Sequence, residues 1–193
     1  MDFSLSESIA ELSCLDYEKR LGAATRIYGY GRSLADGATR NWKLDAELFQ
    51  LLSGPAPEVT VGLAVSRETF KNIHEANDAP RLAHVPEEQD AEEFELQFAG
   101  NILLDVLTSR EPEGTGAIAR YLAKFGEGVQ QVEFRCRDVN RAAEILRSKF
   151  GANSVYPHAR AGANGTQVNF FLVPSTGGGK LLLELYEDAA PDR

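Results

Sequence analysis

The same order of predicted secondary structure occurs twice along this chain of 193 residues. In the first half, the β-branched segment 59–65 (VTVGLAV) predicts a strand, and residues 68–76 predict a helix after it. In the second half, residues 129–136 (VQQVEFRC) predict a strand. A helix follows, which Asp138 caps and which ends at Phe150 before Gly151. A repeated order of this kind indicates an internal duplication.

The last strands of the two halves match as well. LLDVL in the first half and LLELY in the second place Asp105 opposite Glu184, one acid in the middle of each strand. The sequence therefore predicts an α+β fold of paired β-α-β-β-β modules, residues 58–110 and 126–187. We expect the modules to form one curved mixed sheet around a ligand pocket.

Further elements complete the two halves. Residues 93–98 (EFELQF) alternate polar and apolar side chains, and Gly100–Asn101 makes a turn into the segment 102–107 (ILLDVL), which predicts a hairpin. Residues 115–125 predict a connecting helix. The final pair of predicted strands covers residues 167–173 and 181–186, with STGGG as the turn.

The first 57 residues follow a different pattern and are predicted to be a partly helical extension before a domain at 58–190. Apolar spacing predicts helices over residues 8–21 and 45–52. Gly22, Gly29, Gly31 and Gly37 predict turns between these helices, and residues 53–57 (SGPAP) predict a linker. The extension shows no pattern of chemically active residues.

Charge and composition exclude several classes of function. The net charge of −9 disfavours nucleic acid as a partner, because phosphates require clustered Lys and Arg. The chain has no apolar stretch near the length of a membrane span, and its two cysteines cannot form a disulfide framework. These features predict a cytoplasmic protein that binds neither nucleic acid nor membrane.

Three segments resemble a known family. They are GEGVQQVEFRCRDVNRAAEILRSKFGA at 126–152, GTQVNFFLVPSTGGGKLLLELYE at 165–187, and LLDVLTS followed by GAIARYLAKF before Gly126. Together they resemble the methylmalonyl-CoA epimerases and related glyoxalase-like proteins of the vicinal oxygen chelate superfamily. The resemblance implies two modules around a pocket in which four side chains, two from each module, hold a divalent metal.

The four metal positions implied by the resemblance fall on Thr60, Asp105, Gln131 and Glu184. Glu184 matches the family. Asp105 is a shorter acid where Glu or Gln is usual, and Gln131 stands where histidine is usual. Thr60 departs most from the pattern, and Val173 replaces a further histidine before the final turn.

The ligand types limit the metal that such a site would hold. Asp105, Gln131 and Glu184 form a set of oxygen ligands, which suits Mg²⁺ or Mn²⁺ and disfavours Zn²⁺. The absence of two histidines from these positions argues against an iron-dependent ring-cleaving oxygenase. The alternative is that the same three side chains line a pocket without a metal. His158, in a loop of the second half, is the histidine expected to contact a ligand, whereas His74 and His84 are expected to be structural or exposed.

Two classes of function follow. The first is an isomerase or lyase that acts on a small oxygenated acid or thioester by carboxylate-mediated proton transfer, with Glu184 and Asp105 as catalytic residues and Thr60, Gln131 and His158 as ligand-binding residues. The alternative is a non-catalytic protein that sequesters a small molecule on the same scaffold. In a third interpretation the extension covers the pocket or mediates dimerisation, and we expect a homodimer.

Overall fold

The computed structural model describes residues 3–52 and 58–189, and the predicted linker at 53–57 lies outside them. The chain divides into two compact units, which are described separately. Unit 1 comprises Met1–Gly31 and Thr60–Gln130, and unit 2 comprises Arg32–Val59 and Gln131–Arg193. Residues of the N-terminal segment thus belong to both units. The prediction of an independent domain at 58–190 stays a prediction.

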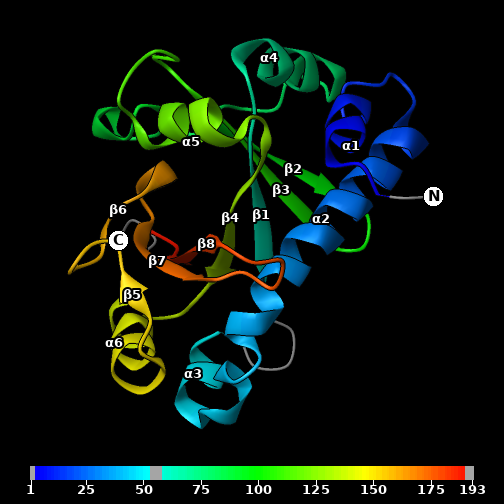
Figure 1. Ribbon diagram of the computed structural model, residues 1–193. Coiled ribbons are helices and arrows are strands. Elements are labelled where there is room, and N and C mark those ends of the chain that lie inside the picture. The colour runs from blue at the N-terminus through cyan, green and yellow to red at the C-terminus, as the bar shows by residue number, and fades with distance from the viewer. Residues whose placement is uncertain (1–2, 53–57, 190–193) are drawn as a thin grey trace. The chain divides into compact units, whose positions relative to one another are not determined.

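The secondary structure is a mixture of helices and strands, which confirms the predicted α+β class (Figure 1). The α-helices are α1 (Leu5–Glu11), α2 (Tyr17–Thr39), α3 (Ala46–Leu51), α4 (Arg67–Ala76), α5 (Ala117–Phe125) and α6 (Val139–Phe150). The strands are β1 (Val59–Ala64), β2 (Ala91–Phe98), β3 (Ile102–Ser109), β4 (Gly128–Arg135), β5 (Asn153–Ser154), β6 (Arg160–Ala161), β7 (Gln167–Pro174) and β8 (Lys180–Glu187). Three short 3-10 helices lie at Trp42–Leu44, Glu87–Gln89 and Ala163–Gly165.

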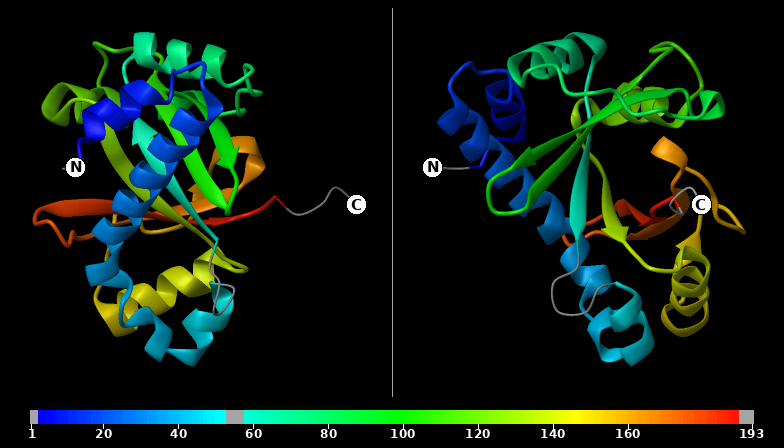
Figure 2. Two further views of the ribbon diagram at one scale, coloured as in Figure 1. Left: turned by 90° about the vertical axis from the view of Figure 1, so that its right-hand side faces the viewer. Right: turned by 180° about the vertical axis from the view of Figure 1, so that it is seen from behind.

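The strands of unit 1 are arranged in the order β2-β3-β1. β2 and β3 form the predicted antiparallel hairpin, and β1 runs parallel to β3; both views of Figure 2 show the three strands side by side. Gly100 and Asn101 have positive φ values of 80° and 58°, the conformation that a tight hairpin turn requires. The prediction of this turn is confirmed.

One face of this sheet is apolar and forms the core of unit 1. Val61, Phe94 and Leu104 are fully buried there. Helix α4 buries Phe70 and Ile73, and the Phe70 ring packs edge-on against Phe94 at 4.7 Å. His74 of the same helix hydrogen-bonds the Pro80 carbonyl at 2.7 Å and stacks on Phe70, so its expected structural role is consistent with its contacts.

Unit 2 contains strands in the order β4-β8-β7-β5, and β6 also pairs with β7. β4 and β8 are parallel, and the other pairs are antiparallel. Helix α6 begins as predicted, because the Asp138 carboxylate accepts a hydrogen bond from the Arg141 backbone N–H at 2.8 Å. It ends at Gly151, whose φ is 61°. Its apolar side, with Val139, Ala142 and Leu146 fully buried, packs on β7 and β8.

The number of strands in unit 1 differs from that of the predicted β-α-β-β-β module. After α4, unit 1 continues with Glu87–Gln89 and then β2 and β3, so it has two strands after its helix, whereas unit 2 has four. The Ala83 N–H donates to the Glu93 carbonyl at 2.9 Å, which is a single ladder bond beside β2. Pro80 and Pro86 flank this position, and proline cannot donate a hydrogen bond to a ladder.

The prediction of turns at Gly22, Gly29, Gly31 and Gly37 is wrong, because all four glycines lie inside the 23-residue helix α2. Glycine weakens a helix but does not forbid it. Buried positions recur along α2 at Ala24, Ile27, Gly31 and Ala35, at helical spacing. A Cβ on Gly31 would lie 2.5 Å from a Val61 methyl group, so this glycine permits close packing of the helix on β1. The predicted helix at 8–21 is accordingly two helices, α1 and the start of α2.

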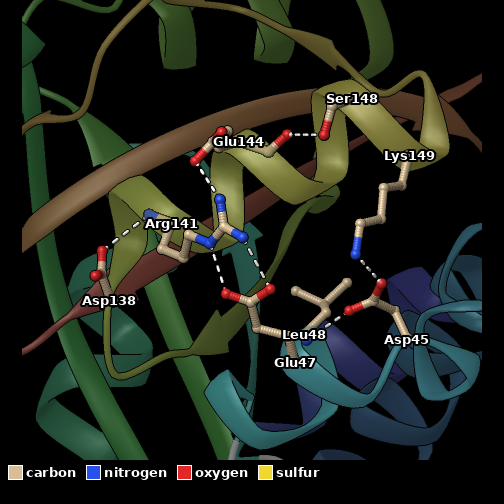
Figure 3. A network of polar contacts seen from close by, with 8 residues as sticks. All are labelled: Asp45, Glu47, Leu48, Asp138, Arg141, Glu144, Ser148 and Lys149. Atoms are coloured by element: carbon tan, nitrogen blue, oxygen red, sulfur yellow. Dashed lines mark hydrogen bonds and ion pairs between the residues drawn. The ribbon is translucent and has the colours of Figure 1, made fainter.

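The N-terminal part of unit 2 is tied to helix α6 by charged side chains (Figure 3). Arg141 binds the Glu47 carboxylate through two hydrogen bonds of 2.6 and 2.9 Å, and Lys149 binds Asp45 at 2.6 Å. Asp45 also caps α3 by accepting from the Leu48 N–H, and this hydrogen bond, followed by that of Lys149, lowers the pKa of Asp45. Helix α3 therefore lies against α6, as both views of Figure 2 show.

Apolar contacts in unit 2 support the same attachment. Trp42 is 4% exposed, and its ring packs edge-on against Phe134 of β4 at 5.6 Å. The Leu51 carbonyl accepts a hydrogen bond from the Arg137 N–H at 3.0 Å. Residues 42–51 are thus part of the folded core of unit 2 and not a loosely attached tail.

No helix within the described ranges, 3–52 and 58–189, has the length and apolar character needed to cross a membrane.

Candidate functional site

Three buried polar side chains of unit 2, those of Gln131, Glu133 and Glu184, lie on one face of its sheet. Because side chains alternate along a strand, Gln131 and Glu133 of β4 point to the same face. Glu184 of β8 is the direct neighbour of Glu133 across the parallel pair. All three side chains are buried, with 6% to 8% exposure. Burial of two carboxylates on an apolar strand is costly unless each has hydrogen-bond partners.

Gln131 supplies such a partner to both acids. Its Nε2 donates to Glu184 Oε2 at 2.8 Å and to Glu133 Oε1 at 3.0 Å. A side-chain amide nitrogen carries two N–H bonds, so one amide can serve two carboxylates. These three side chains, here called the carboxylate–amide cluster, bring together two of the predicted residues, Gln131 and Glu184, and one that the sequence analysis missed, Glu133.

The other two predicted positions occupy equivalent places in unit 1. There Thr60 pairs with Leu103 and Gly62 pairs with Asp105, as Gln131 pairs with Leu182 and Glu133 pairs with Glu184 in unit 2. Thr60 is 2% exposed and Asp105 is half-buried. Thr60 thus corresponds to Gln131 and Asp105 to Glu184, as the duplicated pattern predicts. Glu133 corresponds to Gly62, which has no side chain.

Unit 1 has carboxylates on a different strand of the same face. Glu95 of β2 pairs directly with Asp105, and Glu93 lies two residues before it. Burial raises the pKa of the Glu93 carboxyl from 4.5 to about 7, because an ionised carboxylate loses its hydration there. Glu95 is exposed to solvent, whereas Glu93 is partly buried.

Aromatic and cationic side chains lie next to the carboxylate–amide cluster. Phe170 of β7 is the cross-strand neighbour of Glu184, and the Tyr156 ring packs edge-on against Phe170 at 6.2 Å. The guanidinium of Arg160 lies over the Tyr156 ring at 4.7 Å. His158, the predicted ligand-contacting histidine, is exposed in the same loop between β5 and β6. Its role stays a prediction.

Val173 and Cys136 contribute little to a functional site. Val173, which stands where the family has a histidine, pairs with Leu181 and is buried on the apolar face of the sheet. Burial raises the pKa of the Cys136 thiol to about 12, so this cysteine is a poor nucleophile.

The carboxylate–amide cluster does not fit a divalent metal as it is arranged. A metal would need the amide oxygen of Gln131, but the N–H bonds of this amide point at both carboxylates, and a cation there would meet a donor. Among residues 3–52 and 58–189, no three His, Cys, Asp or Glu side chains converge in a group that could hold a metal ion. The set of Asp105, Gln131 and Glu184 as metal ligands stays a prediction.

Comparisons with known proteins identify similar folds. No family model and no curated protein matches the chain. Among solved structures, methylmalonyl-CoA epimerase from Mycobacterium tuberculosis is 28% identical with a TM-score of 0.57, and the alignment covers 73% of this chain and 91% of that one. A variant of the Streptomyces coelicolor methylmalonyl-CoA epimerase, in complex with 2-nitronate-propionyl-CoA, is 26% identical with a TM-score of 0.54, covering 68% and 96%.

A third structure, methylmalonyl-CoA epimerase in complex with methylmalonyl-CoA and NH4+, is 26% identical with a TM-score of 0.53, and covers 68% of this chain and 93% of that one. The resemblance read from the sequence is therefore confirmed at the level of the fold. The alignments account for nearly the whole of these relatives but leave more than a quarter of this chain without a counterpart.

Proposed function

We propose that this protein catalyses proton transfer at the carbon next to a carbonyl group of a small oxygenated acid or acyl thioester, as an isomerase or lyase. The observation that carries the proposal is the buried carboxylate–amide cluster, in which Gln131 holds the carboxylates of Glu133 and Glu184 at hydrogen-bonding distance. A carboxylate is a suitable base for such a proton when it is shielded from water and held in a fixed orientation.

The comparisons support the substrate class. Two of the similar solved structures are epimerases that hold acyl-CoA compounds, 2-nitronate-propionyl-CoA and methylmalonyl-CoA. In this chain, Glu184 is the proposed proton acceptor. Asp105, at the equivalent position of unit 1, stays the second predicted carboxylate, and Thr60 stays a predicted ligand-binding residue.

The aromatic and cationic side chains beside Glu184 suit an anionic acyl compound. Phe170 and Tyr156 present apolar surface next to the cluster, and Arg160 supplies a positive charge beside them. We propose that Arg160 contacts the carboxylate or phosphate of the substrate, since guanidinium groups bind both through paired hydrogen bonds.

Solvent exchange tests the proposal directly. The full chain, freed of divalent metal with a chelator and then assayed with and without Mn²⁺ or Mg²⁺, is incubated with methylmalonyl-CoA in D₂O, and incorporation of deuterium at the α-carbon is followed by NMR. We expect exchange well above the protein-free rate. Glu184→Gln should reduce it by a factor of about 10³, within the range found for loss of a general base. Glu144→Gln on the exposed side of α6 is the matched control and should exchange like the wild type.

Binding without turnover is the second candidate function. It is favoured by the way in which Gln131 already satisfies both carboxylates, as in a stable structural network. In this case acyl-CoA compounds would raise the melting temperature of the protein, and no deuterium would enter the substrate under any metal condition. That result would replace the proposed enzyme with a sequestering protein.

A further inference from the structure

We propose that Glu133 is a catalytic residue that donates a hydrogen bond to the substrate carbonyl oxygen, while Glu184 removes the neighbouring proton and Gln131 positions both. In this arrangement the carboxyl group of Glu133 takes the place of the divalent metal that the family resemblance implies. The inference rests on the proposed function and makes it specific.

The geometry of the carboxylate–amide cluster places both acids within reach of one substrate. Glu133 and Glu184 are directly opposite each other on neighbouring parallel strands. Their oxygens lie 3.0 and 2.8 Å from the same nitrogen of Gln131. Because the two N–H bonds of an amide diverge, these oxygens are about 5 Å apart. This spacing allows one carboxyl to face a carbonyl oxygen while the other faces the adjacent carbon.

The chemical states of the two acids follow from their proximity. Two buried carboxylates close to one donor repel each other when both are ionised, which favours the state in which one of the two carries a proton. The pair then presents a carboxylate, which can accept a proton, and a carboxylic acid, which can donate a hydrogen bond. The N–H bonds of Gln131 offset part of the remaining negative charge.

The proposed step balances without a further reactant. The α C–H bond breaks, its proton forms an O–H bond with Glu184, and its electron pair remains on the substrate as an enolate. The enolate oxygen accepts the hydrogen bond of the Glu133 carboxylic acid. Return of the proton to carbon reverses the step, and no oxidant or reductant is consumed.

Glu184 is assigned as the base because it occupies the strand position that Asp105, the other predicted catalytic carboxylate, occupies in unit 1. Glu133 stands where unit 1 has only Gly62. It is therefore an addition specific to unit 2. Gln131 contacts both acids and is a positioning residue.

Glutamine substitutions separate these roles, because a side-chain amide imitates a carboxylic acid as a hydrogen-bond donor but cannot accept a proton as a base. In chelator-treated protein, we expect E133Q to exchange deuterium into methylmalonyl-CoA within about tenfold of the wild type. E184Q and E133M should each be slower by a factor of about 10² to 10³, the usual loss for a general base or an oxyanion donor. Each variant is compared by its melting temperature to confirm folding.

Ligand binding gives a readout that does not depend on turnover. The probe is 2-nitronate-propionyl-CoA, whose nitronate carries negative charge like an enolate. E133Q should bind it within about threefold of the wild type, and E133M should bind it at least about tenfold more weakly through loss of the donor. If E133M does not fold, the comparison of E133Q with E184Q still decides the roles, because only one of them should remain active.

The role of Gln131 is tested by Gln131→Met. Since the amide contacts the acids and not the substrate, kcat should fall by a factor of about 10 to 100 while KM stays within about threefold. A change in KM alone would contradict the positioning role.

The failures of the two proposals are distinguishable. Wild-type exchange that requires added Mn²⁺ or Mg²⁺ would leave the proposed function intact and overturn this inference. Loss of activity in E133Q equal to that in E133M, or activity retained in E184Q, would also overturn it. Absence of exchange in the wild type under all conditions would overturn the proposed function and the inference with it.

Discussion

The two units carry the same strand pairing but different polar faces. In unit 1, Asp105 has its carboxylate neighbour on the antiparallel strand β2, at Glu95, and faces Gly62 on β1. In unit 2, the equivalent Glu184 faces Glu133 on the parallel strand β4 and Phe170 on β7. Each unit thus pairs two carboxylates, but on opposite sides of its central acid.

The difference in burial gives the comparison its chemical meaning. Glu95 is exposed, so its charge is solvated and its effect on Asp105 is weakened by water. Glu133 and Glu184 are both 8% exposed and share the Gln131 amide, so their charges influence each other strongly. The two units therefore share the register of their paired strands, whereas the amide that bridges two buried carboxylates is found in unit 2, at Gln131.

Removal of the central acid from each unit should have the largest and most unequal effects. Glu184→Gln should lower the rate of α-proton exchange by a factor of about 10³, because it removes the proposed base. Asp105→Asn should lower it by no more than about tenfold, since its partner is exposed and does not form a buried pair. Exchange rates measured by NMR test this difference. Equal losses in the two variants would show that the central acids of both units contribute equally to the chemistry.

Much of this framework could be predicted because local patterns determine it. Asp138 and Gly151 mark the ends of α6 through capping chemistry that depends only on neighbouring residues. The alternation of residues 93–98 and the Gly100–Asn101 turn similarly indicate the hairpin. Helix α2 could not be predicted in this way. One of its glycines, Gly31, lies directly against Val61, which is distant in the sequence, and that contact is visible only in the fold.

The site was predicted in part for the same reason. Gln131 and Glu184 were found by their positions in matching strands, and the pairing of β4 with β8 brings them together. Glu133 was overlooked although its signal was available, because residues two apart on a strand share a face. Its direct alignment with Glu184 depends on the register of β4 and β8, which cannot be read from the sequence alone. The hydrogen bonds of Gln131 likewise follow from tertiary structure.

The attachment of the N-terminal segment to both units can be tested by core truncation. Trp42→Ala in unit 2 should reduce the free energy of unfolding by about 3 to 5 kcal/mol, because it removes a buried ring that packs on Phe134. Leu12→Ala in unit 1, where the side chain is fully buried, should cost about 2 to 5 kcal/mol. Urea unfolding measures both, and Leu44→Ala, 83% exposed, is the control that should differ little from wild type.

A change of pH should separate the acids of unit 1. The pKa of Glu93 is about 7 in the folded protein and 4.5 in the unfolded chain. The folded state therefore binds more protons between these values, and the free energy of unfolding should fall as pH rises from about 4.5 to about 7. Glu93→Gln should remove this slope and raise stability at pH 8 by about 3 kcal/mol. The exposed Glu95→Gln should keep the wild-type slope, and an unchanged slope in Glu93→Gln would show that Glu93 is solvated like Glu95.

Two glycines of helix α2 provide the smallest effect and the sharpest control, since the same substitution should act in opposite directions. Gly29 is exposed in the helix interior with no atom near the place of a Cβ, so Gly29→Ala should stabilise the protein by about 0.5 to 1 kcal/mol through helix propensity. At Gly31 the new Cβ would lie 2.5 and 2.8 Å from the two methyl groups of buried Val61, and strand β1 leaves that side chain little room to move. Gly31→Ala should therefore destabilise the protein by about 1 to 3 kcal/mol. Thermal unfolding of both variants checks the contrast. Stabilisation by both would mean that α2 does not pack against β1 at Gly31, and the glycines would then have no packing role in unit 1.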